Sequence, residues 1–220
     1  MKKNKKLFSW DFHGTLEQGT EVGFAEILKQ LAREFEVERE IDLTEVRQLF
    51  GTSMQNYLKH FFPEVNKSTH TKMLGRVPNI QTKDQITAYL SPAPYAIEVL
   101  EKIKGTGHTN IIVSNSSPKH IGKFIEIIEI GHLIDKIFAI DRHFSKVTID
   151  PILAKAQAIR KYAADNGFDQ VIVIGDRKTD IDAGRMVGAI TVQYIKRDFP
   201  IDLTDADYKI KNLREVLRLI

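Results

Sequence analysis

The sequence predicts an α/β fold in which a parallel, doubly wound sheet carries helices on both faces. Two observations indicate this class: short apolar runs alternate with helical patterns, and small or polar residues follow most of those runs. A continuous apolar run suits a strand that is covered on both faces, as in a parallel sheet. Strand–helix–strand alternation implies right-handed crossovers, and such sheets bind ligands at the carboxyl ends of their strands.

Four apolar runs are predicted strands, and a fifth run, Lys136–Ile140, is a weaker candidate. The four are Leu7–Trp10, Asn110–Val113, Val171–Ile174 and Ala189–Tyr194. Helical spacing predicts the helices Pro94–Lys104, Pro118–Ile130, Pro151–Asn166 and Thr179–Val187. Three of these begin with proline, which is favoured in a first helical turn. Asp207–Ile220 is predicted to form a last short strand and a closing helix.

The stretch from about Glu21 to Leu90 breaks this alternation, because its pattern is helical throughout. Its apolar residues form two stripes at helical spacing, one beginning at Phe24 and the other at Leu43. We therefore predict a helical insert after the first strand. It divides the chain into an α/β core of residues 1–16 and 92–220 and a helical domain of residues 17–91.

The composition predicts a globular protein, with 42% hydrophobic and 28% charged residues. The net charge of +3 comes from a lysine cluster near the start of the chain, without the arginines and aromatics of a nucleic-acid interface, so we expect no nucleic-acid partner. The absence of cysteine excludes disulfides, thiolate metal sites and a cysteine nucleophile. Since no apolar run is long enough to span a membrane, we expect a soluble cytoplasmic protein.

Polar residues that follow the first and second predicted strands are candidates for phosphate binding. Asp11 places a carboxylate where a buried strand ends, and Gly14 lets the backbone turn and leave amides free to face an anion. Ser114 and Asn115 offer a hydroxyl and an amide after the next strand. Both segments can also be interpreted as ordinary turns, and Ser117-Pro118 is a good helix start in either case.

A third segment, Gly175–Asp180, places two more carboxylates after a predicted strand. Asp176 and Asp180 offer hard oxygen ligands of the kind that magnesium prefers. Thr179 with Asp182 resembles a capping box, which would explain these two residues without catalysis but leaves Asp176 unexplained. If the sheet is parallel, the carboxylates of all segments meet at one edge, where they would repel unless a divalent cation offsets their charge.

In this order, the three segments resemble motifs of the haloacid dehalogenase-like superfamily. Asp11–Thr15 is similar to the first motif, usually Asp-x-Asp-Gly-Thr, and Ser114-Asn115 is similar to the second. Gly175–Asp180 is similar to the fourth, Gly-Asp-x-x-x-Asp. The resemblance covers roughly residues 7–16 and 92–220 and implies a Rossmann-like core, with the helical insert in the place of the family's cap.

The resemblance implies a magnesium-dependent phosphatase that acts on a small phosphorylated metabolite. Asp11 would be the nucleophile that forms an aspartyl-phosphate. The implied metal ligands are Asp11, Asp176, Asp180 and the backbone carbonyl of His13. The implied phosphate-binding residues are Ser114, Gly14, Thr15 and Asn115.

A lysine is also implied, to balance charge on the phosphoryl oxygens, and two lysines compete for this role. Lys155 has a spacing to Gly175 that is similar to the phosphoserine phosphatase branch. Lys146 lies near the place of the more common lysine, where Asp150-Pro151 partly fits the family's pattern.

His13 departs from the first motif, because phosphatases of this family carry an aspartate there that protonates the leaving oxygen and later activates water. A histidine can also transfer protons near neutral pH, so we expect slow but real turnover. We further expect that His13→Asp raises turnover.

Two other interpretations remain open. A 2-haloacid dehalogenase also departs from aspartate at the position of His13, but those enzymes carry tyrosine there and lack the pair that stands here as Gly175-Asp176. A catalytically silent family member would bind a phosphorylated ligand or a protein partner instead. Phosphomutases and phosphonatases share the core, but the former keep an acid at position 13 and the latter need a lysine from the cap.

Overall fold

The structure, a computed structural model, describes residues 5–81, 87–140, 150–200 and 202–220 and divides into two compact units. One unit, the core unit, comprises Met1–Glu17 and Pro92–Ile220. The other, the helical unit, comprises Gln18–Ser91. No helix in the described ranges is both long enough and apolar enough to span a bilayer.

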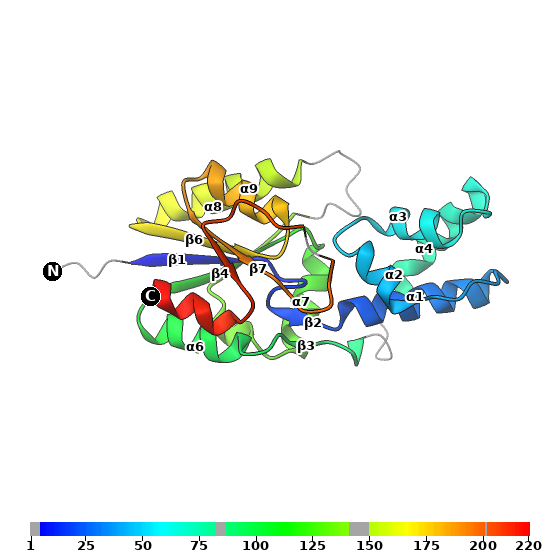
Figure 1. Cartoon of the computed structure of the whole chain (residues 1–220), viewed down its shortest axis with the longest axis horizontal. Helices are drawn as coiled ribbons and strands as arrows, with labels where there is room; N and C mark the ends of the chain where they lie inside the picture. Colours follow the sequence, from blue (N-terminus) through cyan, green and yellow to red (C-terminus); the bar gives the residue numbers. More distant parts are fainter. Residues whose placement is uncertain (1–4, 82–86, 141–149, 201) are drawn as a thin grey trace. The chain divides into compact units, whose positions relative to one another are not determined.

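The core unit is built on a six-stranded sheet in which all neighbouring strands are parallel, in the order β5-β4-β1-β6-β7-β8 (Figure 1). The strands are β1 (Lys6–Trp10), β4 (Thr109–Ser114), β5 (Lys136–Ala139), β6 (Gln170–Gly175), β7 (Ile190–Tyr194) and β8 (Tyr208–Ile210). The predicted doubly wound parallel sheet is therefore confirmed. The weaker candidate strand is present as β5.

Strand β1 lies in the middle of this sheet and is buried on both faces. Leu7 packs in one apolar cluster with Ile111, Val173 and Ile159. Because successive side chains of a strand point to opposite faces, Phe8 faces away from this cluster, and it is fully buried as well. Burial on both faces explains why the strands are continuous apolar runs in the sequence.

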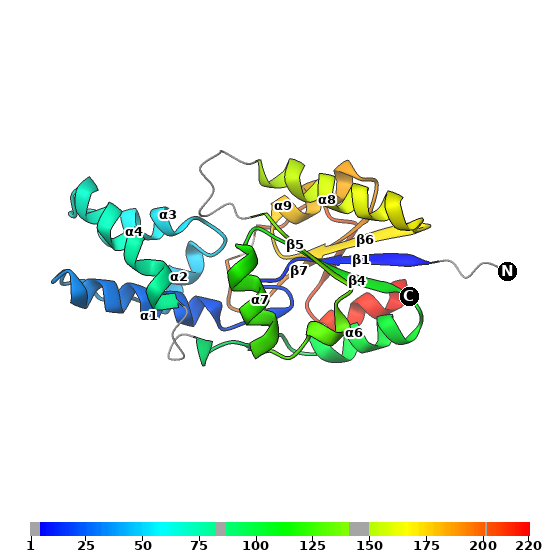
Figure 2. The ribbon, with the colours of Figure 1, turned by 180° about the vertical axis from the view of Figure 1, so that it is seen from behind.

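Helices cover both faces of the sheet (Figures 1 and 2). On one face lie α8 (Pro151–Asn166) and α9 (Lys178–Met186), which pack side by side. On the other lie α6 (Ala96–Gly105) and the final 3-10 helix η2 (Leu213–Leu219). The remaining helices of the core unit are α7 (Pro118–Ile127), which follows β4, and the short 3-10 helix η1 (Gly131–Leu133), which precedes β5.

The helical unit has a hydrophobic core of its own. Its helices are α1 (Thr20–Glu34), α2 (Leu43–Gln48), α3 (Met54–Phe61) and α4 (Lys67–Gln81). The two predicted apolar stripes meet in one buried cluster, in which Leu28 and Leu31 of α1 pack with Tyr57 and Leu58 of α3. Two short strands, β2 (Glu17–Gln18) and β3 (Ser91–Pro92), stand at the two unit boundaries in the sequence and pair in a separate sheet.

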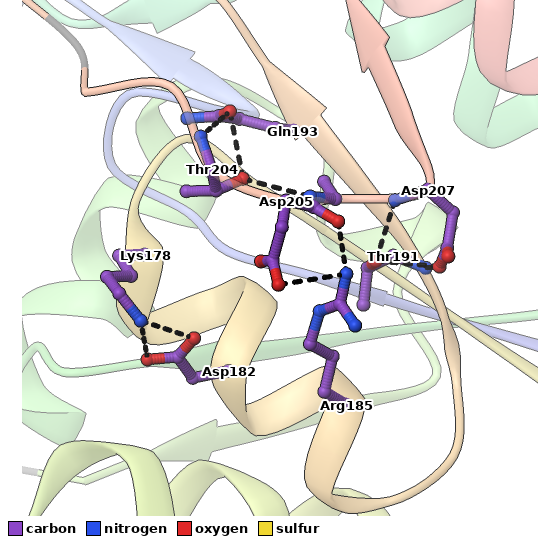
Figure 3. Close-up of polar contacts among 9 residues, drawn as sticks. Lys178, Asp182, Arg185, Thr191, Gln193, Thr204, Asp205 and Asp207 are labelled. Carbon is purple, nitrogen blue, oxygen red and sulfur yellow. Dashed lines mark hydrogen bonds and ion pairs between the residues drawn. The ribbon is translucent and has the colours of Figure 1, made fainter.

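Polar side chains hold β7 to the loop that follows it (Figure 3). The Asp207 carboxylate accepts hydrogen bonds from the Thr191 N–H (2.8 Å) and hydroxyl (2.7 Å). The Gln193 side-chain oxygen accepts from the Thr204 N–H (2.9 Å) and hydroxyl (3.0 Å). We call Thr191, Gln193, Thr204 and Asp207 the β7 network. Since Thr191 and Gln193 are completely buried, their partners prevent the cost of unpaired buried polar atoms.

Candidate active site at the carboxyl edge of the sheet

Three carboxylates predicted to share one edge of the sheet lie together in the structure. Strands β1 and β6 pair with Trp10 opposite Ile174, so the residues that follow them leave the sheet at the same edge. The Asp11 N–H continues this pairing by donating to the Ile174 carbonyl (2.8 Å). Carboxylate oxygens of Asp11, Asp176 and Asp180 all lie within 4.8 Å of one another.

Lys155 is in direct contact with this cluster of carboxylates. Its Nζ donates to Asp11 Oδ1 (2.7 Å) and to Asp180 Oδ1 (2.5 Å), and its side chain is only 3% exposed. The lysine lies in the first turns of α8, which positions it above the strand ends. The competing candidate, Lys146, lies outside the described residues.

Asp180 also caps α9, which corrects the predicted capping box. The helix begins at Lys178, and Asp180 Oδ2 accepts the N–H of Arg177, the residue just before the helix (3.1 Å). The prediction that Thr179 and Asp182 form the box was wrong, because the helix starts one residue earlier and a different carboxylate reaches back. Asp182 instead forms an ion pair with Lys178 (2.7 Å).

Burial and mutual repulsion raise the pKa values of two of the carboxyl groups. Burial and the neighbouring Asp11 carboxylate raise the pKa of Asp176 to about 8, against the opposing effect of Arg177. Burial also raises the pKa of Asp180 to about 6, although Lys155 acts in the other direction. Burial alone would lower the pKa of Lys155, but the carboxylates of Asp11 and Asp180 raise it further above its ordinary value. The cluster therefore carries more negative charge than its own cations balance.

Among the described residues, Asp176 has one carboxylate oxygen that lacks a protein partner. Its Oδ2 lies 3.1 Å from Arg177 Nε, whereas Oδ1 is buried and has no hydrogen-bond partner among the described residues. Gly175 leaves room for the cluster, because a Cβ at this position would lie 2.4 Å from Asp180 side-chain atoms. A buried, unpaired carboxylate oxygen is costly unless a cation binds it. The donor set therefore fits a divalent metal ion with oxygen ligands.

The turn after Asp11 differs from the prediction in one respect. Gly14 adopts a positive φ of 84°, as expected for a sharp turn. The amides that follow it, those of Thr15, Leu16 and Glu17, donate to the Phe12 carbonyl at 3.3, 3.0 and 3.1 Å. These three amides therefore close the turn instead of facing an anion.

Two side-chain atoms in the segments that follow β1 and β4 have unused hydrogen-bonding capacity among the described residues. The Thr15 hydroxyl oxygen and Asn115 Oδ1 are buried and have no hydrogen-bond partner among the described residues. Ser114 ends β4, which pairs with β1, and its hydroxyl oxygen accepts the Ser116 N–H (3.2 Å). Helix α7 begins at Pro118 after the N-cap residue Ser117, where the sequence predicted its start.

His13 contacts a buried glutamate that the sequence analysis missed. His13 Nδ1 lies 2.8 Å from Glu17 Oε2, and the Glu17 side chain is completely buried. His13 Nε2 lies 3.3 Å from the Ser116 hydroxyl oxygen. The sequence feature that could have predicted this contact is an acidic residue four positions after His13, just after the turn at Gly14. That turn brings the two residues together in a β-bridge.

Comparison with known proteins identifies the family of the chain. The family model described as "Haloacid dehalogenase-like hydrolase" matches residues 9–193. This range contains all three aspartates of the cluster, together with Lys155. No curated protein sequence matches the chain.

Solved structures share the fold along nearly the whole chain. A haloacid dehalogenase-like hydrolase from Streptococcus pneumoniae is 18% identical with a TM-score of 0.77, and the match covers 98% of each chain. A predicted phosphoglycolate phosphatase from Haemophilus somnus is 16% identical with a TM-score of 0.77, over 100% of this chain and 99% of the other. A predicted phosphatase from Clostridium acetobutylicum is 15% identical with a TM-score of 0.73, over 99% and 98%. The family match over most of the chain shows that this protein belongs to the haloacid dehalogenase-like hydrolases.

Proposed function

We propose that the protein is a magnesium-dependent phosphatase that hydrolyses a small phosphorylated metabolite through an aspartyl-phosphate on Asp11. The observation that carries this proposal is the contact of Asp11 with Lys155 inside a cluster of buried carboxylates at the carboxyl edge of the sheet. The solved structures from Haemophilus somnus and Clostridium acetobutylicum are described as predicted phosphatases, which is consistent with the same chemistry.

In the first step, the Asp11 carboxylate attacks phosphorus, and the bond between phosphorus and the leaving oxygen breaks. His13 donates a proton to that oxygen, so the product leaves as an alcohol. In the second step, water attacks the aspartyl-phosphate and gives a proton to His13, which releases inorganic phosphate and restores the Asp11 carboxylate. The Lys155 ammonium balances negative charge on the phosphoryl oxygens throughout.

Asp11, Asp176, Asp180 and the backbone carbonyl of His13 would hold the magnesium ion. When bound, the ion would neutralise charge on the phosphate and help to orient it. With Lys155 and Arg177 protonated and the three carboxylates ionised, the cluster keeps one excess negative charge, which favours the binding of a cation. Asp176 Oδ1, which has no protein partner among the described residues, is available as a ligand atom.

The phosphoryl oxygens would be bound by the hydroxyl groups of Ser114 and Thr15 and by the amide of Asn115. Gly14 would provide the turn that follows Asp11. The proposal is supported by the buried, unpartnered atoms of Thr15 and Asn115 in the part of the chain that the structure describes. We assign residues 17–91 the role of a cap that restricts access to small substrates. Substrate choice would then depend on side chains of the helical unit.

The proposal can be tested with magnesium and beryllofluoride, which together imitate an aspartyl-phosphate. They should raise the melting temperature of the wild-type protein by several degrees and leave Asp11→Asn unaffected. Asp182→Asn is a matched control, because Asp182 also lies on α9 but its carboxylate pairs with Lys178. Wild-type stabilisation no larger than that of Asp11→Asn would overturn the proposal.

A catalytically silent protein that binds a phosphorylated ligand is the second candidate, and His13 in place of the usual aspartate favours it. Beryllofluoride would stabilise such a protein too, so turnover must decide between the two. Hydrolysis of an aryl phosphate and of a panel of phosphorylated metabolites should exceed that of Asp11→Asn in the presence of magnesium. Equal rates on every substrate would favour the silent protein.

A further inference from the structure

The imidazole of His13 is held at both of its nitrogen atoms. Nδ1 lies 2.8 Å from the Glu17 carboxylate, and Nε2 lies 3.3 Å from the Ser116 hydroxyl oxygen in the loop between β4 and α7. The Glu17 side chain is 0% exposed, whereas that of His13 is 22% exposed. The histidine is therefore open to solvent and ligands on the side that its buried partner does not occupy.

Aromatic packing and the tight turn fix the orientation of the His13 ring. The rings of Phe12 and Phe124 contact it edge-on, with centroids at 5.0 and 5.6 Å. The Glu17 N–H donates to the Phe12 carbonyl, and a β-bridge joins His13 to Glu17, so the backbone sets the distance between the two side chains. Both the ring and its carboxylate partner are thus preorganised by elements of the core unit.

The 2.8 Å separation of His13 Nδ1 and Glu17 Oε2 is the geometry in which a carboxylate oxygen accepts a hydrogen bond from a ring N–H. Nε2 is then the nitrogen that can give or take a proton, and it points to the loop that follows Ser114. A carboxylate that orients a histidine in this way recurs where histidine acts as an acid or base.

We propose that Glu17 is a positioning residue, which holds His13 with Nδ1 protonated and directs Nε2 toward the phosphoryl group. The His13–Glu17 pair would then do the work of the single aspartate that phosphatases of the family carry at position 13. This inference rests on the proposed phosphatase function.

The pair also changes the expected outcome of His13→Asp. The new carboxylate at position 13 would lie beside the buried carboxylate of Glu17, and like charges in a buried place repel. The single substitution should therefore lower turnover, contrary to the expectation from the sequence alone. His13→Asp combined with Glu17→Gln should be more active than His13→Asp alone, because an amide can donate to the new carboxylate.

The decisive experiment compares Glu17→Gln in two backgrounds. In the wild-type protein, it should lower kcat by about 10- to 100-fold, as is usual for loss of a group that orients a functional side chain, and change KM by less than about twofold. In His13→Ala, the same substitution should change kcat by less than about twofold, because Glu17 acts through His13. An equal fall of kcat in both backgrounds would show a purely structural role and overturn the proposal.

Asp135→Asn is the control for loss of a hydrogen-bonded carboxylate of the core unit, although Asp135 is exposed and Glu17 is buried. Asp135 accepts the Asn110 N–H (2.9 Å) and precedes β5, at the amino end of that strand, so the substitution should leave kcat within about twofold of wild type. A fall as large as that of Glu17→Gln would mean that kcat reports general damage to the core unit, which would overturn the specific role of Glu17.

Nitrogen-15 NMR of His13 gives a second readout that needs no turnover and no folded variant. The wild-type spectrum should show a proton on Nδ1, and a neutral ring protonated only on Nε2 would overturn the proposal.

Beryllofluoride stabilisation separates the positioning role of Glu17 from the proposed phosphatase function. If the protein is stabilised but kcat is insensitive to Glu17→Gln, the positioning role fails and the phosphatase stands. If nothing is stabilised, the phosphatase fails with the catalytic part of this inference.

Discussion

Two polar regions of the core unit contain aspartates whose pKa values shift in opposite directions. In the β7 network, the N–H and hydroxyl of Thr191 donate to Asp207 and lower its pKa (Figure 3). In the carboxylate cluster at the strand ends, burial and the Asp11 carboxylate raise the pKa of Asp176 to about 8. The same side chain is thus stabilised in its charged form in one place and destabilised in the other.

This difference separates a structural polar region from a functional one. Donors and acceptors of the β7 network match without a ligand, and the network contributes stability by itself. The carboxylate cluster costs stability until something compensates its charge, and perturbed groups of this kind concentrate at functional sites. The two regions are neighbours, because the Gln193 side-chain nitrogen donates to the Asp176 backbone carbonyl (3.4 Å). The β7 network can therefore hold the carboxylate cluster in place.

The largest expected effect is on turnover, from Asp11→Asn. Loss of a nucleophile typically costs about four orders of magnitude or more in kcat, so hydrolysis should fall to background. Thr191→Val in the β7 network should leave kcat within about twofold, which would sharpen the comparison. Rates should be measured with magnesium at saturating substrate. Hydrolysis by Asp11→Asn at more than a hundredth of the wild-type rate would show that the cluster is not the phosphoryl acceptor.

Lys155→Met should affect both stability and activity. It removes the cation that contacts two carboxylates, and breaking a buried charge pair in this way costs about 3–5 kcal/mol of unfolding free energy. The loss should be measured by urea unfolding without metal, and magnesium should restore part of it. The control is Lys161→Met on the same helix, whose side chain is 79% exposed and whose loss should leave the unfolding free energy close to that of wild type. Equal losses of unfolding free energy for the two substitutions would contradict the claim that the cluster carries excess negative charge.

The pH dependence of stability should also distinguish the two regions. The folded-state pKa values of Asp176 (about 8) and Asp180 (about 6) lie above the unfolded-state value of about 3.9. The folded protein then binds more protons than the unfolded chain. The contribution of these two groups to the metal-free unfolding free energy is therefore highest below about pH 4 and falls as the pH rises toward 8. The pKa of Asp207 is lowered, so its contribution to the unfolding free energy is present above about pH 4 and is lost in acid.

Unfolding free energies between pH 4 and 8, with and without magnesium, test this expectation. Each group contributes a slope of at most about 1.4 kcal/mol per pH unit, and both magnesium and Asp176→Asn should flatten the curve above pH 6. Asp207→Asn should leave the slope above pH 6 unchanged. A metal-free stability that rises steadily from pH 5 to 8 would show that the cluster is not strained by its charge.

Much of the fold could be predicted from the sequence because its signals are local. Strands buried on both faces are continuous apolar runs, and the observed bounds of β1, β4 and β6 lie within one residue of the predicted ones. The start of α9 was misplaced by one residue because several acidic side chains could cap it, and only the packed helix shows which one reaches back. Helix boundaries therefore depend on contacts that spacing does not determine.

The carboxylates of the candidate site could be predicted from strand ends, but their surroundings could not. The choice between Lys155 and Lys146 depends on which turn of a helix faces the sheet edge, and that follows from the packing of α8. Glu17 was missed because its partner is set by a turn in which three amides share one carbonyl, a conformation that residue types alone do not specify. Under the proposed function, a partner such as Glu17 would set the orientation in which His13 acts.

The smallest expected effect comes from Thr191→Val, which removes a hydroxyl from the β7 network. Asp207 keeps the Thr191 N–H as a partner but loses two of its three hydrogen bonds to this residue, one accepted by its carboxylate and one donated by its own N–H. The unfolding free energy should therefore fall by about 1–2 kcal/mol. The beryllofluoride-induced rise in melting temperature should stay within a degree of wild type, because the backbone that Gln193 supports is untouched. If that rise is lost while the free energy hardly changes, the β7 network belongs to the ligand site, and the separation of the two regions is wrong.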